Sequence, residues 1–281
     1  HEVFTKDAQY DRSALRDRAL QSSFLVPGLT LQLSDLRDPE DLWQESFQHK
    51  GGIAEYASFL SAGEEIGGVI RLTGSGNFAE TVPVLDDQGH MTSQEVQREL
   101  GVDIGLIWNT GYESILRSFV NVIATPKGGT HVIGLERALT KVFNEYLKES
   151  KILKASEDGV TKEDVSEGLT AVVAVRLAEP QFEGQTKEIL GTPAATRIVS
   201  AVVAKEMTKW LKTPPRGDKA TARLIAEKVA NAMRARVAAR SHRDTQRRKT
   251  ALESSSMPAK LVDCRSTDVA ESELFIVEGD S

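Results

Sequence analysis

The sequence predicts an α+β fold, because strand and helix patterns alternate through the middle of the chain. Residues 169–177 carry apolar side chains at every second position, which is typical of a strand. Apolar residues between 135 and 146 recur every three or four positions, which is typical of one helix face. After Pro214-Pro215, a long helical pattern leads to a new apolar run at 274–277. We therefore expect one α+β domain, a helical connector and the beginning of a further part of the protein.

The first third of the chain carries short patterns bounded by glycine and charged residues. The stretch Thr92–Glu95 has the pattern of a capping box, which predicts a short helix that stops at Gly101. Gly74-Ser75-Gly76 is interpreted as a turn between strands. In chain order, the patterns predict a helix at 7–22, a strand at 29–33, irregular chain at 35–50, a helix at 51–60, strands joined by turns at 62–90, the capped helix at 92–100 and a half-buried strand at 104–109.

The remaining elements have clearer boundaries. Thr192-Pro193 supplies an N-cap and a first-turn proline, and Pro214-Pro215 ends the helix that follows. The next helix is expected to be roughly 50 Å long, a length that usually links parts of a molecule. In chain order, the patterns predict a strand at 116–124, a helix at 130–148, a short helix capped by Thr161 and Asp164, a strand at 169–177, a helix at 192–213 and a helix at 218–252.

Composition excludes several classes of protein. The 281 residues suffice for one large domain or two ordinary ones, and 40% hydrophobic with 27% charged residues is typical of a soluble globular protein. No apolar run is long enough to span a bilayer. A single cysteine, Cys264, excludes an internal disulfide framework and suits a reducing compartment such as the cytoplasm. An apolar run next to the end of the sequence leaves a sheet incomplete, so we expect a fragment of a longer protein.

The loop after the strand at 169–177 reads EPQFEGQTK and is the first candidate site. Lys187 can meet a phosphate as a compact point charge. Gln185 lies two residues earlier, so on an extended backbone it points the same way. The alternative is a solvated turn, and the loop by itself does not decide between the two.

Arginine and lysine residues crowd the end of the longest predicted helix, between residues 234 and 249. Cations there complement the helix dipole, and a solvated helix end is one interpretation. The other is a positive surface that faces nucleic-acid phosphate. The candidate DNA-facing residues are Arg240, Arg243, Arg247 and Arg248.

The third candidate is the sequence LFIVEGDS at 274–281. Its apolar residues suit a strand that is buried on both faces, which places Glu278 at the carboxyl end of that strand. Glu278 and Asp280 are the kind of ligand that Mg²⁺ prefers. A polar turn is the alternative. His131 has no plausible metal partner nearby in the sequence.

Seven motifs together resemble the ATPase-bearing component of bacterial type IIA DNA topoisomerases, the family that includes gyrase B and its topoisomerase IV counterpart. The resemblance covers nearly the whole chain, and the stretch PAKLVDCRSTD resembles actinobacterial members. The motifs do not distinguish gyrase from topoisomerase IV. In family order they are WNTGY, TPKGGTH, EGLTAVVAVRLAEPQFEGQTK, ARVAAR, RRK, MPAKLVDCRSTD and ELFIVEGDS.

The resemblance implies four parts and a set of roles. Residues 1–35 would end a GHKL ATPase domain, 36–215 would form a transducer domain like ribosomal protein S5, 216–255 the connector helix, and 256–281 the start of a truncated TOPRIM domain. Lys187 would contact the terminal phosphate of ATP with help from Gln185, and Glu278 would bind Mg²⁺ for DNA cleavage and rejoining.

The resemblance also implies partners. These are DNA, a DNA-cleaving A subunit in an A2B2 heterotetramer, and a second copy of the ATPase chain that associates in an ATP-dependent manner. No membrane association is expected. Residues 85–100 are longer and more polar than the family leads us to expect, and we interpret them as a surface insertion. Two rival interpretations stay open: an S5-like nucleic-acid-binding module without ATP dependence, and a TOPRIM nuclease or primase. We expect the fragment alone to be inactive.

Overall fold

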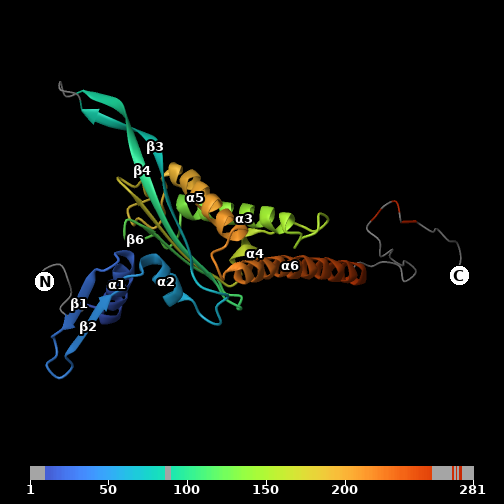
Figure 1. Cartoon of the computed structure of the whole chain (residues 1–281), viewed down its shortest axis with the longest axis horizontal. Coiled ribbons are helices and arrows are strands. Elements are labelled where there is room, and N and C mark those ends of the chain that lie inside the picture. The colour runs from blue at the N-terminus through green and yellow to red at the C-terminus, as the bar shows by residue number, and fades with distance from the viewer. Residues whose placement is uncertain (1–9, 86–89, 255–267, 269, 271, 274–281) are drawn as a thin grey trace. The chain divides into compact units, whose positions relative to one another are not determined.

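A five-stranded mixed sheet forms the centre of the first part of the chain (Figure 1). The computed structural model describes residues 10–85, 90–254, 268, 270 and 272–273, and the chain divides into two units, 1–234 and 235–281. The strands lie in the order β3-β4-β7-β5-β6, and only the β5–β7 pair is parallel. The predicted α+β class is confirmed. The strands are β3 (Ile70–Leu85), β4 (Met91–Trp108), β5 (Ile115–Val120), β6 (Ile123–Ala124) and β7 (Leu169–Leu177).

Helices cover both faces of this sheet. Helix α3 (Thr130–Glu149) packs along α5 (Pro193–Lys212), and α5 also contacts β3 and β4. Helix α2 (Gly52–Leu60) lies against β4 and β7. The strands at the centre are therefore buried on both faces, and residues 169–173 of β7 are all buried. The end of β4, which the sequence predicted to be half-buried, is buried on both faces for the same reason.

Glycines in β3 let α5 approach the sheet closely. A Cβ atom at Gly74 would lie 2.9 Å from a methyl group of Val202, and one at Gly76 would lie 2.9 Å from a methyl group of Ile198. The interpretation of Gly74-Ser75-Gly76 as a turn is therefore wrong. Residues 70–85 form one strand rather than several, and the glycines serve helix packing within it.

Strand β4 runs through the region where the capping-box pattern predicted a helix. Residues 91–108 pair with β3 from Leu85↔Met91 to Ile70↔Leu106. The Thr92 hydroxyl donates to the carbonyl of Val84 on the partner strand at 3.1 Å instead of capping a helix. The predicted helix is wrong because the long partner strand supplies backbone hydrogen bonds that a four-residue pattern does not reveal.

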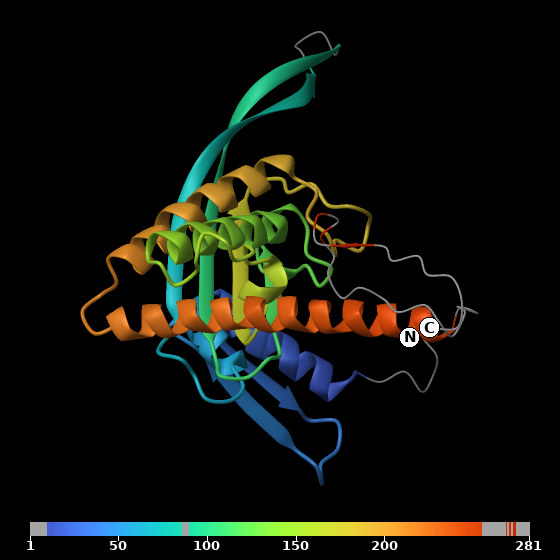
Figure 2. The ribbon, with the colours of Figure 1, turned by 90° about the vertical axis from the view of Figure 1, so that its right-hand side faces the viewer.

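The outer halves of β3 and β4 extend past the helices as a two-stranded arm, as both views show (Figures 1 and 2). Residues 91–95 are all exposed on this arm. The surface insertion that we expected at 85–100 is therefore part of a β-hairpin that continues the sheet, and residues 86–89 lie outside the described residues.

Residues 10–50 form a helix and a small antiparallel sheet. Helix α1 (Arg12–Leu25) precedes β1 (Thr30–Asp35) and β2 (Trp43–Gln48), which pair with each other. The second of these strands lies in the stretch that we expected to be irregular. Phe24 of α1 stacks on Tyr56 of α2 at a centroid distance of 4.7 Å and belongs to one buried cluster with residues of β4, β5 and β7.

The predicted strand at 116–124 is divided into β5 and β6 by a tight turn. Asn121 and Val122 both have positive φ, 53° and 78°. The Asn121 side chain donates to the Leu177 carbonyl at 2.7 Å and accepts from the Leu177 amide at 3.0 Å. This amide side chain takes the place of a backbone partner at the end of β7, and asparagine tolerates the left-handed region better than most residues.

Two further helices complete the described chain. Helix α4 (Lys162–Ser166) has the predicted capping box between Thr161 and Asp164, and α6 (Lys219–Ser254) has the predicted length and position. Its role as a connector stays a prediction. Among the described residues, no helix is long and apolar enough to cross a membrane.

The WNTGY motif at 108–112 joins several of these elements. The Trp108 indole donates to the Val165 carbonyl at 3.0 Å, and the Asn109 side chain donates to the Ala62 carbonyl at 2.8 Å. Lys228 of α6 donates to the Gly111 carbonyl at 2.8 Å. The motif therefore ties the end of β4 to α4 and to the first half of α6.

Candidate functional site

The QTK sequence lies at the tip of a narrow loop that follows β7. At its base, the Gly191 amide donates to the Gln181 carbonyl at 2.8 Å, and the Glu183 amide donates to the Ile189 carbonyl at 3.0 Å. Phe182 and Leu190 form an antiparallel bridge between these two bonds. The loop from Gln181 to Gly191, which we call the sensing loop, is therefore a closed hairpin with a defined shape.

Gln185 and Lys187 are both exposed at the tip of the sensing loop. Gly184 and Lys187 have positive φ, 83° and 58°, and Gln185 and Thr186 form a turn. The expectation of an extended backbone between these two residues is therefore wrong. The Lys187 ammonium lies 5.9 Å from the centroid of the Phe182 ring, and within the described residues no carboxylate pairs with it.

The TPKGGTH motif at 125–131 holds the sensing loop through backbone hydrogen bonds. The Leu190 amide donates to the Gly128 carbonyl at 3.1 Å, and the Thr130 amide donates to the Leu190 carbonyl at 2.9 Å. Gly129 lies between them with φ 131°, and a Cβ atom there would lie 2.4 Å from both the nitrogen and the oxygen of Leu190. We call residues 126–130 the cradle. Two motifs that lie about sixty residues apart in the sequence thus form one structure.

Lys127 of the cradle forms an ion pair with Glu188 of the sensing loop, with Nζ 2.7 Å from Oε2. The hydrogen bond from Lys127 lowers the pKa of the Glu188 carboxyl group below its usual value. Glu188 is adjacent to Lys187, so its charge would otherwise oppose an anion at the tip. The Lys127 ammonium offsets this charge. Sequence analysis missed Lys127, although its place in the TPKGGTH motif was a signal.

The base of the sensing loop is attached to the arm. The Gln181 side chain donates to Glu80 Oε1 at 2.6 Å, and Arg98 pairs with Glu80 at 3.2 Å and with Glu179. Arg98 and Glu80 are largely shielded from solvent, with 14% and 16% of their side-chain surface exposed. These contacts fix where the loop leaves the sheet, and no local pattern in the sequence indicated them.

His131 ends the TPKGGTH motif and is fully buried in the first turn of α3. Burial lowers the pKa of its imidazole to about 4, so the ring is neutral at physiological pH. Among the described residues, no group of three or more histidine, cysteine, aspartate or glutamate residues could hold a metal ion.

The basic stretch on α6 is only partly a free surface. Arg234 pairs with Glu157, with Nε 2.7 Å from Oε1, and belongs to the packing of the first unit. Arg240, Arg243 and Arg247 are exposed, and in the part of the chain that the structure describes none of them pairs with a carboxylate. The side chain of Arg248 lies outside the described residues.

Glu278 and the apolar run at 274–277 also lie outside the described residues, as does most of the expected TOPRIM segment. Their placement and the metal role of Glu278 stay predictions. The domain boundaries that we expected at 35, 215 and 255 stay predictions as well.

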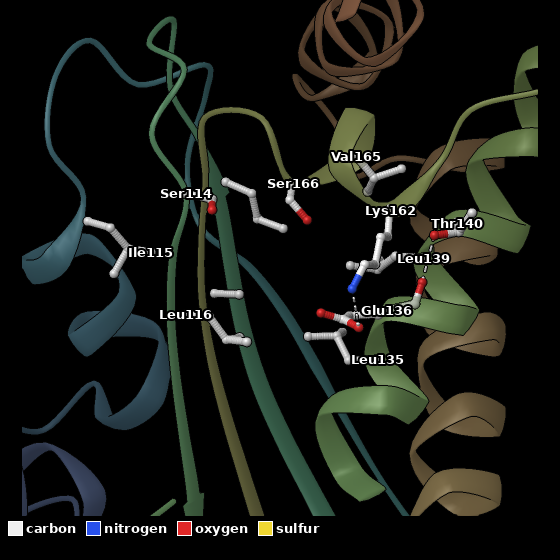
Figure 3. A pocket seen from close by; sticks show the side chains of 12 residues that line it. Ser114, Ile115, Leu116, Leu135, Glu136, Leu139, Thr140, Lys162, Val165 and Ser166 are labelled. Carbon is white, nitrogen blue, oxygen red and sulfur yellow. Dashed lines mark hydrogen bonds and ion pairs between the residues drawn. The ribbon is translucent and has the colours of Figure 1, made fainter. Parts of the chain in front are cut away.

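A small apolar cavity of about 100 Å³ lies between α3, α4 and the sheet (Figure 3). Leu116, Leu135 and Leu139 line it, together with Lys162 and Glu136, whose Nζ and Oε2 atoms lie 3.7 Å apart. The volume is below the range of ~300–1,000 Å³ that small-molecule sites usually have. We therefore assign no ligand to it.

Comparisons with known proteins identify the family of this chain. A family model for DNA gyrase B matches residues 52–245. The DNA gyrase B protein of Streptococcus pyogenes serotype M3 is 39% identical over 280 residues, which cover 100% of this chain and 39% of that protein. The DNA gyrase B protein of Staphylococcus aureus is 36% identical and is covered to 40%. The chain thus spans about two fifths of the length of these relatives.

Solved structures agree with this assignment. The 43K ATPase domain of Thermus thermophilus gyrase B is 30% identical, with a TM-score of 0.65 over 87% of this chain and 58% of that one. The topoisomerase IV ATP-binding domain of Francisella tularensis is 22% identical, with a TM-score of 0.59. The match covers 84% of this chain and 57% of that one, and it shows a shared fold. The chain belongs to the DNA gyrase B family of bacterial type IIA topoisomerases.

Proposed function

We propose that this chain is part of the ATP-hydrolysing subunit of a type IIA DNA topoisomerase, with Lys187 as its contact to the terminal phosphate of ATP. The observation that carries the proposal is the sensing loop. It is closed at its base, supported by the cradle, and exposes at its tip a lysine that no described carboxylate neutralises. A loop that was only a solvated turn would not need this support.

The charges around the tip fit an anionic ligand. Lys127 offsets the charge of Glu188, which leaves the Lys187 ammonium as a point charge at the tip. Lys187 would donate a hydrogen bond to the terminal phosphate and stabilise charge that develops there during hydrolysis. A charge-assisted hydrogen bond contributes roughly 1.5–3 kcal/mol, enough to bias the closing of two domains without locking them. Gln185 would assist from the same turn.

Lys187→Ala in the full-length protein is expected to slow ATP hydrolysis at least about tenfold, while ATP affinity falls only modestly. The base and sugar of ATP would be held elsewhere in the protein, so the lost contact acts mainly on turnover. Lys187→Arg is expected to restore only part of the rate, because a planar guanidinium does not reproduce a compact ammonium. The paired measurement is nucleotide affinity and single-turnover hydrolysis.

Lys205→Ala is the matched control, since among the described residues the ammonium of this exposed lysine of α5 pairs only with its neighbour Glu206. It is expected to leave both quantities unchanged. If the hydrolysis rate of Lys187→Ala stays within about twofold of the unchanged protein, Lys187 does not contact the phosphate and the sensing loop is only a solvated turn. The ATP-independent, S5-like nucleic-acid-binding module would then be the better interpretation.

We further propose that the arginines toward the end of α6, of which Arg240, Arg243 and Arg247 are exposed, face DNA in the assembled enzyme. Replacing Arg243, Arg247 and Arg248 with Gln is expected to weaken DNA binding and to flatten the slope of log affinity against log salt, because fewer phosphates are neutralised. Arg223→Gln, on the same helix but paired with Glu227 at 2.7 Å, is the control that should leave the slope unchanged. An unchanged slope in the triple variant would contradict the DNA-facing role and favour the interpretation as a solvated helix end.

The remaining parts of the proposal follow from family membership. Glu278 would bind Mg²⁺, which supplies the charge stabilisation for DNA cleavage and rejoining. The partners would be DNA, the DNA-cleaving A subunit in an A2B2 heterotetramer, and a second copy of the ATPase chain in the presence of ATP, in the cytoplasm. The products would be supercoiled, relaxed or decatenated DNA.

A further inference from the structure

Three buried side chains form a hydrogen-bonded chain beside the cradle. The Ser118 and Thr125 hydroxyl oxygens lie 2.8 Å apart, and Thr125 Oγ1 lies 3.2 Å from His131 Nε2. The Ser118 hydroxyl also donates to the Thr125 carbonyl at 2.8 Å. Their exposed fractions are 7%, 0% and 0% for Ser118, Thr125 and His131. We call these three residues the hydroxyl–histidine chain.

The direction of the protons along this chain follows from its end points. The Ser118 proton goes to the Thr125 carbonyl, so the Thr125 proton is free to go to Ser118 Oγ, and His131 Nε2–H then donates to Thr125 Oγ1. His131 Nδ1 is buried without a partner among the described residues. A bare nitrogen lone pair there costs less than a buried N–H without an acceptor, which favours the neutral tautomer with its proton on Nε2. Every donor in the chain is then satisfied.

The hydroxyl–histidine chain joins the two ends of the cradle. Thr125 immediately precedes residues 126–130, and His131 immediately follows them. Their side-chain contact therefore closes the cradle into a ring that Ser118 anchors to β5. The backbone of this ring carries the sensing loop, through Gly128 and Thr130 to Leu190 and through the Lys127 amide to the Glu188 carbonyl at 3.3 Å.

We propose that Ser118, Thr125 and His131 are positioning residues for the reaction: they hold the cradle, and through it the sensing loop, where Lys187 reaches the terminal phosphate. This inference rests on the proposed function of Lys187. None of the three touches the substrate, and all act through backbone contacts at 188–190. Because a displacement of about 1 Å can slow catalysis up to ~100-fold, a loosened ring is sufficient to impair turnover.

The test compares two conservative changes at one buried position in the full-length protein. Thr125→Val keeps the shape of the side chain but removes the hydroxyl group, whereas Thr125→Ser keeps the hydroxyl group. We expect Thr125→Val to lower the hydrolysis rate about fivefold with nearly unchanged ATP affinity, and Thr125→Ser to retain most of the rate. If Thr125→Val does not fold, Ser118→Ala interrupts the same chain at its other end.

Two additional readouts separate positioning from general stability. In a Lys187→Ala background, Thr125→Val should slow hydrolysis no further, because both changes remove the same contact. Amide exchange at Leu190 and Thr130 should be about tenfold faster in Thr125→Val, because these amides report the bonds between cradle and sensing loop. The exchange measurement does not depend on ATP.

Asn144→Leu is the control for general destabilisation, at a position on α3, the helix that begins in the cradle. Its side chain donates to the Val160 carbonyl at 2.8 Å and accepts from the Val160 amide at 2.9 Å, far along α3 from the cradle. It should destabilise the chain without changing hydrolysis or the exchange at Leu190. The inference is overturned if Thr125→Val slows hydrolysis no more than Asn144→Leu, or additively with Lys187→Ala, or leaves the exchange unchanged. Unchanged hydrolysis in Lys187→Ala alone would instead contradict the proposed contact between Lys187 and the terminal phosphate.

Discussion

Gly129→Ala is expected to lower the free energy of unfolding by about 3 kcal/mol or more. Two causes add at this position. The backbone has φ 131° and ψ −162°, a region that is essentially restricted to glycine. The added Cβ would also lie 2.4 Å from two backbone atoms of Leu190, which is fully buried and cannot move aside. The cradle and the sensing loop would have to separate, so ATP hydrolysis should fall together with stability.

A graded series of glycine substitutions checks this by urea unfolding of the chain. In Gly184→Ala the positive φ of 83° strains the alanine backbone, but the space around the new Cβ atom is open. We expect this change to lower the free energy of unfolding by about 1–2 kcal/mol. Gly68→Ala has neither strain nor a close neighbour and should change stability by less than ~1 kcal/mol. Equal effects at all three positions would mean that the contact between Gly129 and Leu190 does not hold the two segments together.

Glu278→Gln in the full-length protein is expected to reduce Mg²⁺-dependent DNA cleavage at least about 100-fold. A hard cation prefers charged carboxylate oxygens, and the neutral amide that replaces one is a much poorer ligand. ATP turnover should persist, because Lys187 and its support do not include this residue. The measurement is the yield of cleaved DNA at several Mg²⁺ concentrations, with ATP hydrolysis assayed in the same preparation.

Lys187→Ala provides the matched comparison for that experiment. It should slow ATP hydrolysis and leave Mg²⁺-dependent cleavage in place, which is the reverse of the pattern for Glu278→Gln. Two variants with opposite effects assign the two reactions to different residues. Normal cleavage by Glu278→Gln would exclude the metal role, whatever the result for ATP.

The cradle shows how far the sequence could lead toward the candidate site. The TPKGGTH motif and the lysine of QTK were both visible in the sequence, and the resemblance gave Lys187 its expected role. Their contact was not visible, because it depends on a bridge between Gly129 and Leu190, sixty-one positions apart. The roles that we propose for Lys127 and Thr125 both depend on that contact. The support of the site was therefore beyond any local pattern.

The sequence by itself determined the α+β class, α2, α3, α5, α6, the capping box of α4 and the strand β7, because each carries a strong local period or an end signal. Only the tertiary structure decided the course of residues 70–108. There, glycines, threonines and a false capping box obscured two long strands. A strand obtains its hydrogen bonds from a partner that can lie anywhere in the chain, whereas a helix forms its bonds within four residues. The same reason places the sensing loop on the cradle: their backbone groups lie about sixty residues apart in the sequence, and only the tertiary fold brings them within hydrogen-bonding distance.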